Sequence, residues 1–333
     1  MVKKKVENRT IEENNVDIFC SEATNSLISL NKKKIKYNAF QRKAEIVEGG
    51  LKVNFKEFET KKEKLSENIF KEFELGKPVV RTNTWKLLDI IMMEFTKNNS
   101  LRSKKVDIKT SIPLLEIAKL LGYDVEPREV PAEEEAKEKT RIKGILDNVR
   151  KEVDKDSELL YMMSLSWQSP SKRRDFLDMR LLQGKGIKRN TLTIWLSTLF
   201  GEYLVGSYIN KYPVNILKTK GVNPVSYQLG LRLSNHYCVN KIKKNNNLNR
   251  LGLKSILESV GDIPKIEEVK ELRHWTRYIQ EPILRALEHL KEVEVLKDYQ
   301  FQNKKGNTLT LEEISKLEYL EFEKLYLYFE MCQ

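Results

Sequence analysis

Histidine and cysteine are scarce in this 333-residue chain, which contains three of each. The cysteines, Cys20, Cys238 and Cys332, lie far apart, and none belongs to a Cys-x-x-Cys pair. This spacing excludes a zinc-finger pattern and argues against a disulfide framework, so it fits a reducing compartment. The histidines are equally scattered, and we therefore expect no metal site and no metal-dependent nuclease.

Two further absences narrow the class of protein. The chain has no Gly-x-x-x-x-Gly-Lys-Ser/Thr phosphate loop, which argues against an ATPase. No run approaches the ~18 apolar residues that a membrane span requires, and the basic start of the chain has no apolar stretch behind it. We therefore expect no cofactor, no membrane association and a location in the bacterial cytoplasm.

Positive charge is what the chain has in excess. Its net charge is +12, and its hydrophobic content of 40% is that of a soluble globular protein long enough for two domains. The stretch from Ser171 to Lys254 holds sixteen Lys or Arg against three acids, so the rest of the chain is close to neutral. Concentrated charge of one sign attracts polyanions. We infer a polyphosphate partner, with a solvated lysine-rich surface as the alternative.

The first half of the chain predicts a basic arm and then a module of helices and strands. Residues 1–75 indicate a partly ordered N-terminal arm that ends in a helix over 61–74. Within residues 76–190, the sequence first predicts a helix from Thr82 or Thr84, an extended piece over 106–109, a helix over 113–121 closed by Gly122 and a helix over 136–153. Two strands follow, over 160–167 and 176–182, with a basic turn over 168–174 between them. This is the order of a winged helix, whose third helix enters a DNA groove while the turn between its strands touches the backbone.

The second half, residues 191–333, repeats this order without repeating the residues. After a basic link over 184–190, the predicted elements are a strand over 191–196, a helical turn over 199–204, a helix over 224–240, a polar loop over 241–249, a helix over 253–260, a long helix over 266–290, a strand over 293–301, a turn over 303–307 and a closing segment over 319–329. Pro282 predicts a kink at or just before Glu281. We expect an α+β, helix-rich fold with two winged-helix domains in tandem, joined near residue 190.

Candidate DNA-contacting residues follow from this order. Arginine pairs bidentately with guanine and glutamine with adenine, whereas lysines in turns contact phosphates. The candidates are the polar and basic residues of the third helices, the two turns and the polar loop: Lys139, Thr140, Lys143, Lys172, Arg173, Arg174, Lys241, Lys243, Lys244, Lys270, Arg273, His274, Arg277, Gln280, Lys304 and Lys305. An ordinary solvated helix face is the alternative interpretation of the helical candidates.

The C-terminal part also resembles a known family. The strings that carry the resemblance are Tyr227–Tyr237 (YQLGLRLSNHY), Leu253–Leu257, Asp262–Pro264, Arg273–Trp275 and Ile279–Pro282. In this order they resemble the C-terminal module of plasmid replication initiator (Rep) proteins, which are built from two winged-helix domains. The resemblance implies a non-enzymatic protein that binds repeated origin sites in double-stranded DNA and recruits host replication proteins. A second copy of the chain is a further candidate partner, because dimers of such initiators often repress while monomers initiate.

Two other functions stay open at this point. A transcription regulator would use the same fold without supporting replication. A tyrosine recombinase is suggested by Arg232, by the His-x-x-Arg string His274–Arg277 and by Tyr299 or Tyr319 as nucleophile. However, Arg232 and His274 lie closer together in the sequence than that fold places its two boxes.

Overall fold

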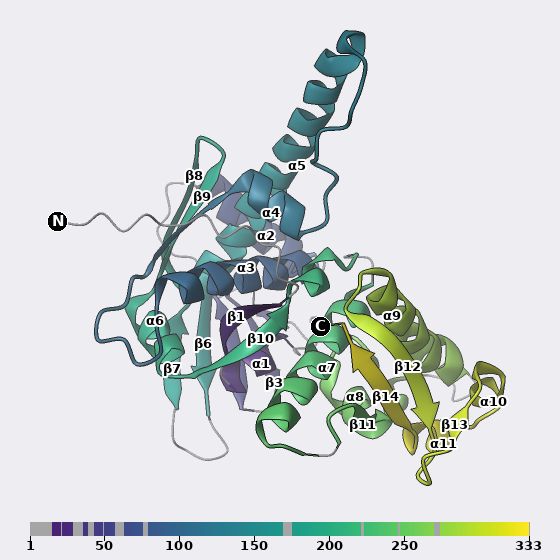
Figure 1. Ribbon diagram of the computed structural model, residues 1–333. Coiled ribbons are helices and arrows are strands. Elements are labelled where there is room, and N and C mark those ends of the chain that lie inside the picture. Colours follow the sequence, from purple (N-terminus) through teal and green to yellow (C-terminus); the bar gives the residue numbers. More distant parts are fainter. Residues whose placement is uncertain are drawn as a thin grey trace.

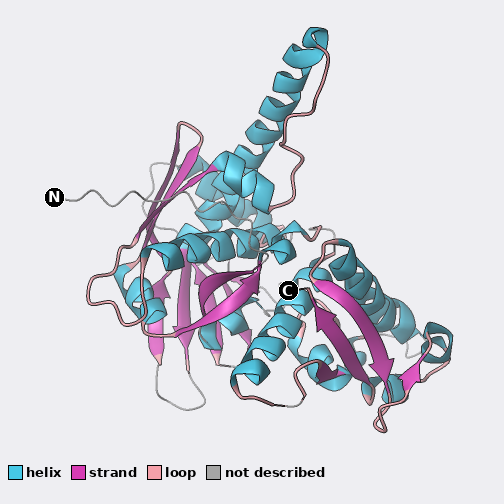
Figure 2. Cartoon of the chain, viewed as in Figure 1, coloured by secondary structure: helices cyan, strands magenta, loops and turns pink. Residues whose placement is uncertain are grey.

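The computed structural model describes residues 15–20, 22–28, 36–38, 43–48, 50–56, 63–75, 79–168, 175–220, 223–245, 247–269 and 274–332. Figure 1 shows a larger body and, beside it, a smaller one that begins with helix α7. Both combine helices with strands (Figure 2), and every strand pair among the described residues is antiparallel. The fold is therefore α+β, as expected.

The larger body contains a three-stranded sheet in the order β5-β9-β8. In chain order, its elements and the helices beside it are α3 (Thr82–Asn98), β5 (Lys109–Pro113), α4 (Leu114–Leu120), α5 (Glu135–Met162), β8 (Leu182–Lys188) and β9 (Thr191–Leu196). Helix α3 is almost wholly buried, including the apolar residues that recur at helical spacing from Trp85 to Phe95. Gly122 closes α4 with a φ of +79°, which glycine adopts without strain.

A five-stranded sheet in the order β2-β3-β4-β6-β7 completes the larger body. Its strands are β2 (Lys36–Asn38), β3 (Lys43–Glu48), β4 (Leu51–Phe55), β6 (Met163–Trp167) and β7 (Phe176–Arg180). Separately, β1 (Asn15–Cys20) pairs with β10 (Tyr208–Pro213), and the remaining helices are α1 (Glu22–Ile28), α2 (Glu63–Glu74) and α6 (Thr198–Val205). Because β4 pairs with β6 and β1 with β10, the described residues before 75 belong to the larger body and do not form a separate arm.

The structure differs from the prediction after the third helix. Helix α5 continues to Met162, so the strand expected from residue 160 begins only at Met163. The strand pair that follows, β6 and β7, belongs to the five-stranded sheet. The hairpin beside β5 is instead β8–β9, although residues 184–190 were expected to be a link. The predicted joint near residue 190 falls in the turn of this hairpin, and the larger body continues through β10.

The smaller body repeats the arrangement of the three-stranded sheet. Its elements are α7 (Pro224–Ile242), β11 (Arg250–Gly252), α8 (Leu253–Ser259), the π-helical turn η6 (Thr276–Gln280), α9 (Glu281–Glu292), β12 (Leu296–Gln302), β13 (Thr308–Leu309), α10 (Leu311–Ser315), α11 (Tyr319–Glu323) and β14 (Tyr326–Met331). The sheet order is β11-β14-β12-β13. In both sheets, the strand that comes last in the chain lies between the first and the second. In the larger body, β9 lies between β5 and β8, and in the smaller body, β14 lies between β11 and β12.

The long third helix expected over residues 266–290 is shorter. Residues 266–268 form a single 3₁₀ turn, η4 (Ile266–Glu268), and the described helix runs from η6 into α9. Pro282 lies in the first turn of α9, directly after the π-helical residues. A proline cannot donate to the preceding turn, and the wider π turn accommodates its ring at the predicted position of the kink. The inward side of this helix is apolar, and its residues Trp275, Ile279, Ile283, Leu287 and Leu290 are all buried.

Among the described residues, no helix has both the length and the apolar character needed to cross a membrane.

Candidate nucleic-acid interface

The first candidate surface is the outer half of α5, residues 135–148. None of these residues is buried, whereas the inner half from Val149 onward supplies eight buried residues. Figures 1 and 2 show the outer half projecting away from the larger body. Lys139, Thr140 and Lys143 are all exposed on it. The structure therefore presents these three predicted residues to solvent.

Ion pairs and burial anchor the inner half of α5. Asp156 is buried and lies 3.1 Å from Nη2 of Arg81, just before α3. Lys185 of β8 lies 2.9 Å from Glu158 and 3.3 Å from Asp154. Burial raises the pKa of the Asp156 carboxyl, against the opposing effect of Arg81. Ion pairs to Arg81 and Lys185 thus fix the inner half of α5, and the projecting half continues from it.

The outer half carries charges of both signs. Arg141 donates hydrogen bonds to the Glu138 carboxylate and to the carbonyl oxygens of Asp124 and Glu126, so the loop before α5 is tied to the helix. The hydrogen bond from Arg141 lowers the pKa of Glu138 to about 2. Nζ of Lys139 lies 3.3 Å from Glu135, while Lys143 has no ion pair within the described part of the chain. Lys143 is therefore the cation of this surface most available to a partner.

The second candidate surface is the outer side of the π-helical turn η6. His274 and Arg277 are exposed there, as expected. Tyr278, which the sequence did not single out, is 48% exposed, and Cζ of Arg277 lies 5.8 Å from the centre of its ring. A guanidinium beside an exposed aromatic ring suits contact with phosphates and bases.

Gln280 does not belong to this surface, and its prediction as a base contact was wrong. The side chain is only 4% exposed, and its Nε2 donates to the carbonyl oxygen of Ile314 at 2.9 Å. Residues 279 and 280 both turn toward the core because the π turn widens the inward side of the helix. Gln280 therefore links η6 to α10 through this hydrogen bond.

The basic turn between β12 and β13 is a third candidate, and it contains Lys304 and Lys305. Both are exposed, and Gly306 closes the turn with a φ of +88°. The turn is preorganised, since Oδ1 of Asn303 accepts hydrogen bonds from the backbone N–H groups of Lys305 and Asn307 at 2.9 and 3.1 Å.

The polar loop after α7 leads to this same turn. Lys241, Lys243 and Lys244 are exposed at the end of α7. The loop then enters β11, where Nη2 of Arg250 donates to the carbonyl oxygen of Asn303 at 3.1 Å. The structure therefore connects the predicted loop and the predicted turn through one arginine.

Sequence reasoning missed the turn of the β8–β9 hairpin as a candidate. Lys188, Arg189 and Asn190 are exposed, and the φ angles of the last two are 49° and 59°. Two consecutive positive φ angles describe the tight hairpin turn that suits the twist of antiparallel strands. The carbonyl oxygen of Asn190 accepts the backbone N–H of Leu114, so the turn also contacts the start of α4. The alternation of residues 182–196, with asparagine at the reversal, was the available signal.

Five predicted residues lie outside the described part of the chain: Lys172, Arg173, Arg174, Lys270 and Arg273. The remaining candidates do not form one patch. Figure 1 places the outer half of α5 at the top of the molecule and the β12–β13 turn at the bottom. The basic stretch also contributes internal contacts, such as the Lys185 pairs with α5. The candidates that the structure describes therefore do not make one continuous basic surface.

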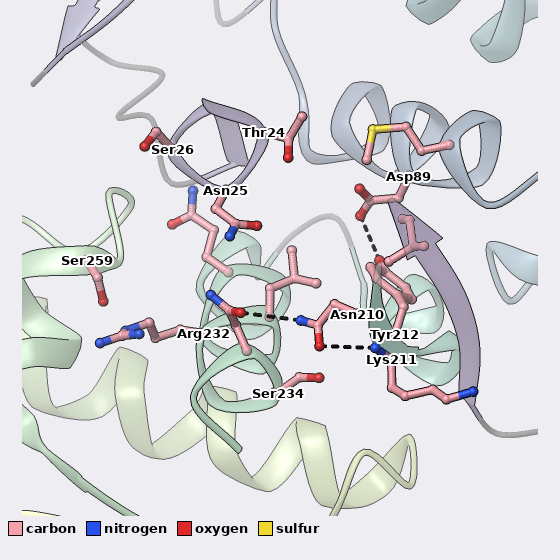
Figure 3. Close-up of a pocket in the computed structure, with 15 residues that line it drawn as sticks. Thr24, Asn25, Ser26, Asp89, Asn210, Lys211, Tyr212, Arg232, Ser234 and Ser259 are labelled. Atoms are coloured by element: carbon pink, nitrogen blue, oxygen red, sulfur yellow. Dashed lines mark hydrogen bonds between the residues drawn. The ribbon is translucent and has the colours of Figure 1, made fainter. Parts of the chain in front are cut away.

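A cavity of about 220 Å³ lies where the two bodies meet (Figure 3), with walls from α1, α3 and β10 on one side and α7 and α8 on the other. Asp89 stands at one end of it and Arg232 at the other. Nη2 of Arg232 donates to Oγ of Ser255 at 2.8 Å, and burial lowers the pKa of this guanidinium. The cavity belongs to the junction and lies apart from the exposed basic surfaces.

Comparison with known proteins adds no assignment: no protein-family model matches the chain, and no curated protein matches it. Within the described residues, no group of three or more His, Cys, Asp or Glu is arranged to hold a metal ion.

Proposed function

We propose that the chain is a sequence-specific double-stranded DNA-binding protein made of two winged-helix modules. The observation that carries the proposal is the repeated arrangement of helix, strand, helix, helix and an antiparallel pair of strands, in which the last strand of each sheet lies between the first and the second. In the first module these elements are α3, β5, α4, α5 and β8–β9. In the second they are α7, β11, α8, the η6–α9 helix and the strands β12 and β14. Helix-turn-helix relatives place the last helix of this series in a DNA groove.

The projecting half of α5, the outer side of η6 and the two hairpin turns have separate roles in DNA binding. The outer half of α5 spans 14 residues, or about 21 Å at 1.5 Å per residue, which is enough to cross a major groove. In the second module, Arg277 and Tyr278 face outward at the corresponding place. The β8–β9 turn and the β12–β13 turn are the wings, and their lysines contact phosphates without reading sequence.

Within this class, we propose initiation of replication on a plasmid or similar mobile element in the bacterial cytoplasm. The support is the resemblance of the C-terminal module to Rep proteins together with two modules that could each occupy part of a repeated origin site. Host replication proteins and a second copy of the chain are the proposed partners. A transcription regulator would bind DNA equally well, and a plasmid-maintenance assay in a strain lacking the protein separates the two.

The pKa values of the two candidate nucleophiles, Tyr299 and Tyr319, argue against the recombinase alternative. A nucleophilic tyrosine needs a hydroxyl that loses its proton readily. Burial raises the pKa of Tyr299 and of Tyr319, and the Tyr299 hydroxyl already donates to Glu288 at 2.7 Å. Absence of a covalent tyrosyl adduct on nicked suicide substrates would remove this alternative.

The direct test is selection of binding sites from random duplex DNA with the wild-type chain and with Arg277→Ala. Wild type should enrich one sequence, and the variant should lose on the order of 1 to 3 kcal/mol of binding with relaxed preference at one base pair. The matched control is Lys71→Ala, which removes an exposed cation on α2 and should change neither property. Failure of wild type to enrich any duplex would contradict the proposal, and unchanged selection by Arg277→Ala would show that η6 is misassigned.

A further inference from the structure

The segment that joins the two bodies is held by side chains from both of them. After β10, the 3₁₀ helix η3 (Val214–Lys218) leads through Thr219 and Lys220 toward α7. The Lys86 ammonium of α3, on a side chain only 1% exposed, donates to the carbonyl oxygen of Thr219. On the other side, the backbone N–H of Lys220 donates to Nε2 of His289 in α9 at 3.0 Å. Each body therefore forms a hydrogen bond to the connection, the larger one at Thr219 and the smaller one at Lys220.

A buried carboxylate also joins helix α3 of the larger body directly to helix α7 of the smaller one. Asp89 of α3 is 1% exposed and accepts hydrogen bonds at one oxygen from the hydroxyls of Tyr212 in β10 and Tyr227 in α7. Figure 3 shows Asp89 and Tyr212 in contact at the edge of the cavity. Burial raises the pKa of Asp89 to about 6, against the opposing effects of the two tyrosines and Lys86. Polar groups buried this deeply persist only where their partners stay in place.

Close backbone packing supports these polar contacts. A Cβ atom at Gly230 of α7 would come within 2.8 Å of Leu290 and 3.3 Å of Ile216. A Cβ atom at Gly122, where α4 ends, would lie 3.3 Å from Lys218. The described part of the connection, residues 214–220, is thus packed between α4 on one side and α7 and α9 on the other, which leaves this part little room to bend.

We propose that Lys86, Asp89 and Tyr227 are positioning residues that fix the distance and rotation between the two DNA-contacting surfaces and thereby set the spacing between two half-sites. This inference rests on the proposed function. One base pair rotates the duplex by about 34 to 36°, so a rigid junction selects one spacing, whereas a loose one tolerates several. The outer half of α5 and the β12–β13 turn lie at opposite ends of the molecule (Figure 1), which makes their separation depend on the junction between the two bodies.

The first measurement needs no DNA and tests the rigidity alone. Spin labels at Lys104→Cys and Arg285→Cys, both exposed, report the distance between the bodies after Cys20, Cys238 and Cys332 are replaced by serine. Wild type should give one narrow distance distribution, and Lys86→Met and Tyr227→Phe should each broaden it. The matched controls are Lys185→Met, which removes a cation paired within the larger body, and Tyr299→Phe, which removes a tyrosine–carboxylate hydrogen bond within the smaller one. A broad distribution in wild type would overturn the inference, as would unchanged distributions in both junction variants.

The second measurement tests the consequence for DNA. Selection from random 40-bp duplexes should give two half-sites at a single spacing for wild type. Tyr227→Phe and Lys86→Met should select the same half-sites over several spacings and lose about tenfold in affinity for the wild-type composite site, because a loose link lowers the effective concentration of the second module. Identical single spacings for the variants would overturn the inference while leaving the proposed function standing. No enrichment by wild type, together with a narrow spin-label distance, would instead remove the proposed function. Tyr227→Phe removes a single hydroxyl, so it keeps the test valid if Lys86→Met does not fold.

Discussion

Asp89 shows how a single residue in the helix α3 can combine a structural and an electrostatic role. Its carboxylate lies in the interior, where ionisation is costly, yet two tyrosine hydroxyls and the Lys86 ammonium favour the charged form. Desolvation is the larger effect, so the pKa rises from 3.8 to about 6. The unfolded chain releases this proton at lower pH than the folded chain does.

The sign of the resulting pH dependence follows directly. A raised folded-state pKa gives stability that is complete below pH 3.8 and is lost as the pH rises through about 6. Between pH 5 and 8, this one group should lower the free energy of unfolding by about 1 to 2 kcal/mol. Denaturant unfolding of wild type and of Asp89→Asn across this range measures it, since the amide can still accept both tyrosine hydroxyls but does not titrate.

Asp147→Asn, at an exposed position of α5, is the control for a change of carboxyl to amide. It should retain the wild-type pH profile. If Asp89→Asn shows the same slope between pH 5 and 8 as wild type, then Asp89 does not titrate as argued.

At the same scale, Gln280 shows where reading the sequence fails. A regular α-helix places residues 273, 277 and 280 on one face, and the pattern therefore grouped Gln280 with Arg277. The π turn adds a residue to the turn and moves position 280 inward. Pro282 predicted an irregularity in the helix, but the sequence did not show that the irregularity would be a π turn.

At the scale of elements, the apolar stripes of helices were predictable and the partners of strands were not. The α3 helix, the glycine end of α4 and the α7 helix follow from local periodicity and capping, and the structure confirms them. Strand pairing depends on distant residues. The β6–β7 hairpin looked like the one beside β5, but β4, from the first 75 residues, pairs with β6 and draws it into another sheet. No local signal in residues 160–182 indicates that choice.

Helix α5 carries the most specific prediction at this scale. Replacing both Lys139 and Lys143 with alanine should weaken duplex binding and reduce the slope of log affinity against log salt concentration by about 2, because two phosphate contacts no longer release counterions. The free energy of unfolding should change by less than about 0.5 kcal/mol, since both side chains are exposed. Salt titrations of fluorescence anisotropy measure the slope.

The control for this double variant is Lys71→Ala with Lys97→Ala, which removes the same charge from α2 and α3 of the larger body. It should leave the slope close to the wild-type value. An equal reduction in both double variants would mean that net charge, and not the projecting helix, governs the affinity.

At the scale of the whole molecule, the charge of +12 indicated an anionic partner but not where it binds. Among the described residues, the exposed candidate cations lie at several separate places on the two bodies. A duplex bound by both modules would therefore be contacted in two separate places. The order of predicted elements suggested a repeat but chose the wrong pair of strands in its first half, and no sequence pattern shows the hydrogen bond between Tyr227 and Asp89 that joins the two bodies.

Hydroxyl-radical footprinting of the wild-type complex on a duplex selected from random sequence tests the two-module account most directly. We predict two protected tracts, each about one helical turn long, with the Lys139 and Lys143 replacements weakening protection in one tract and Arg277→Ala weakening it in the other. A single tract altered by both sets of replacements, or a duplex without any protection, would contradict it.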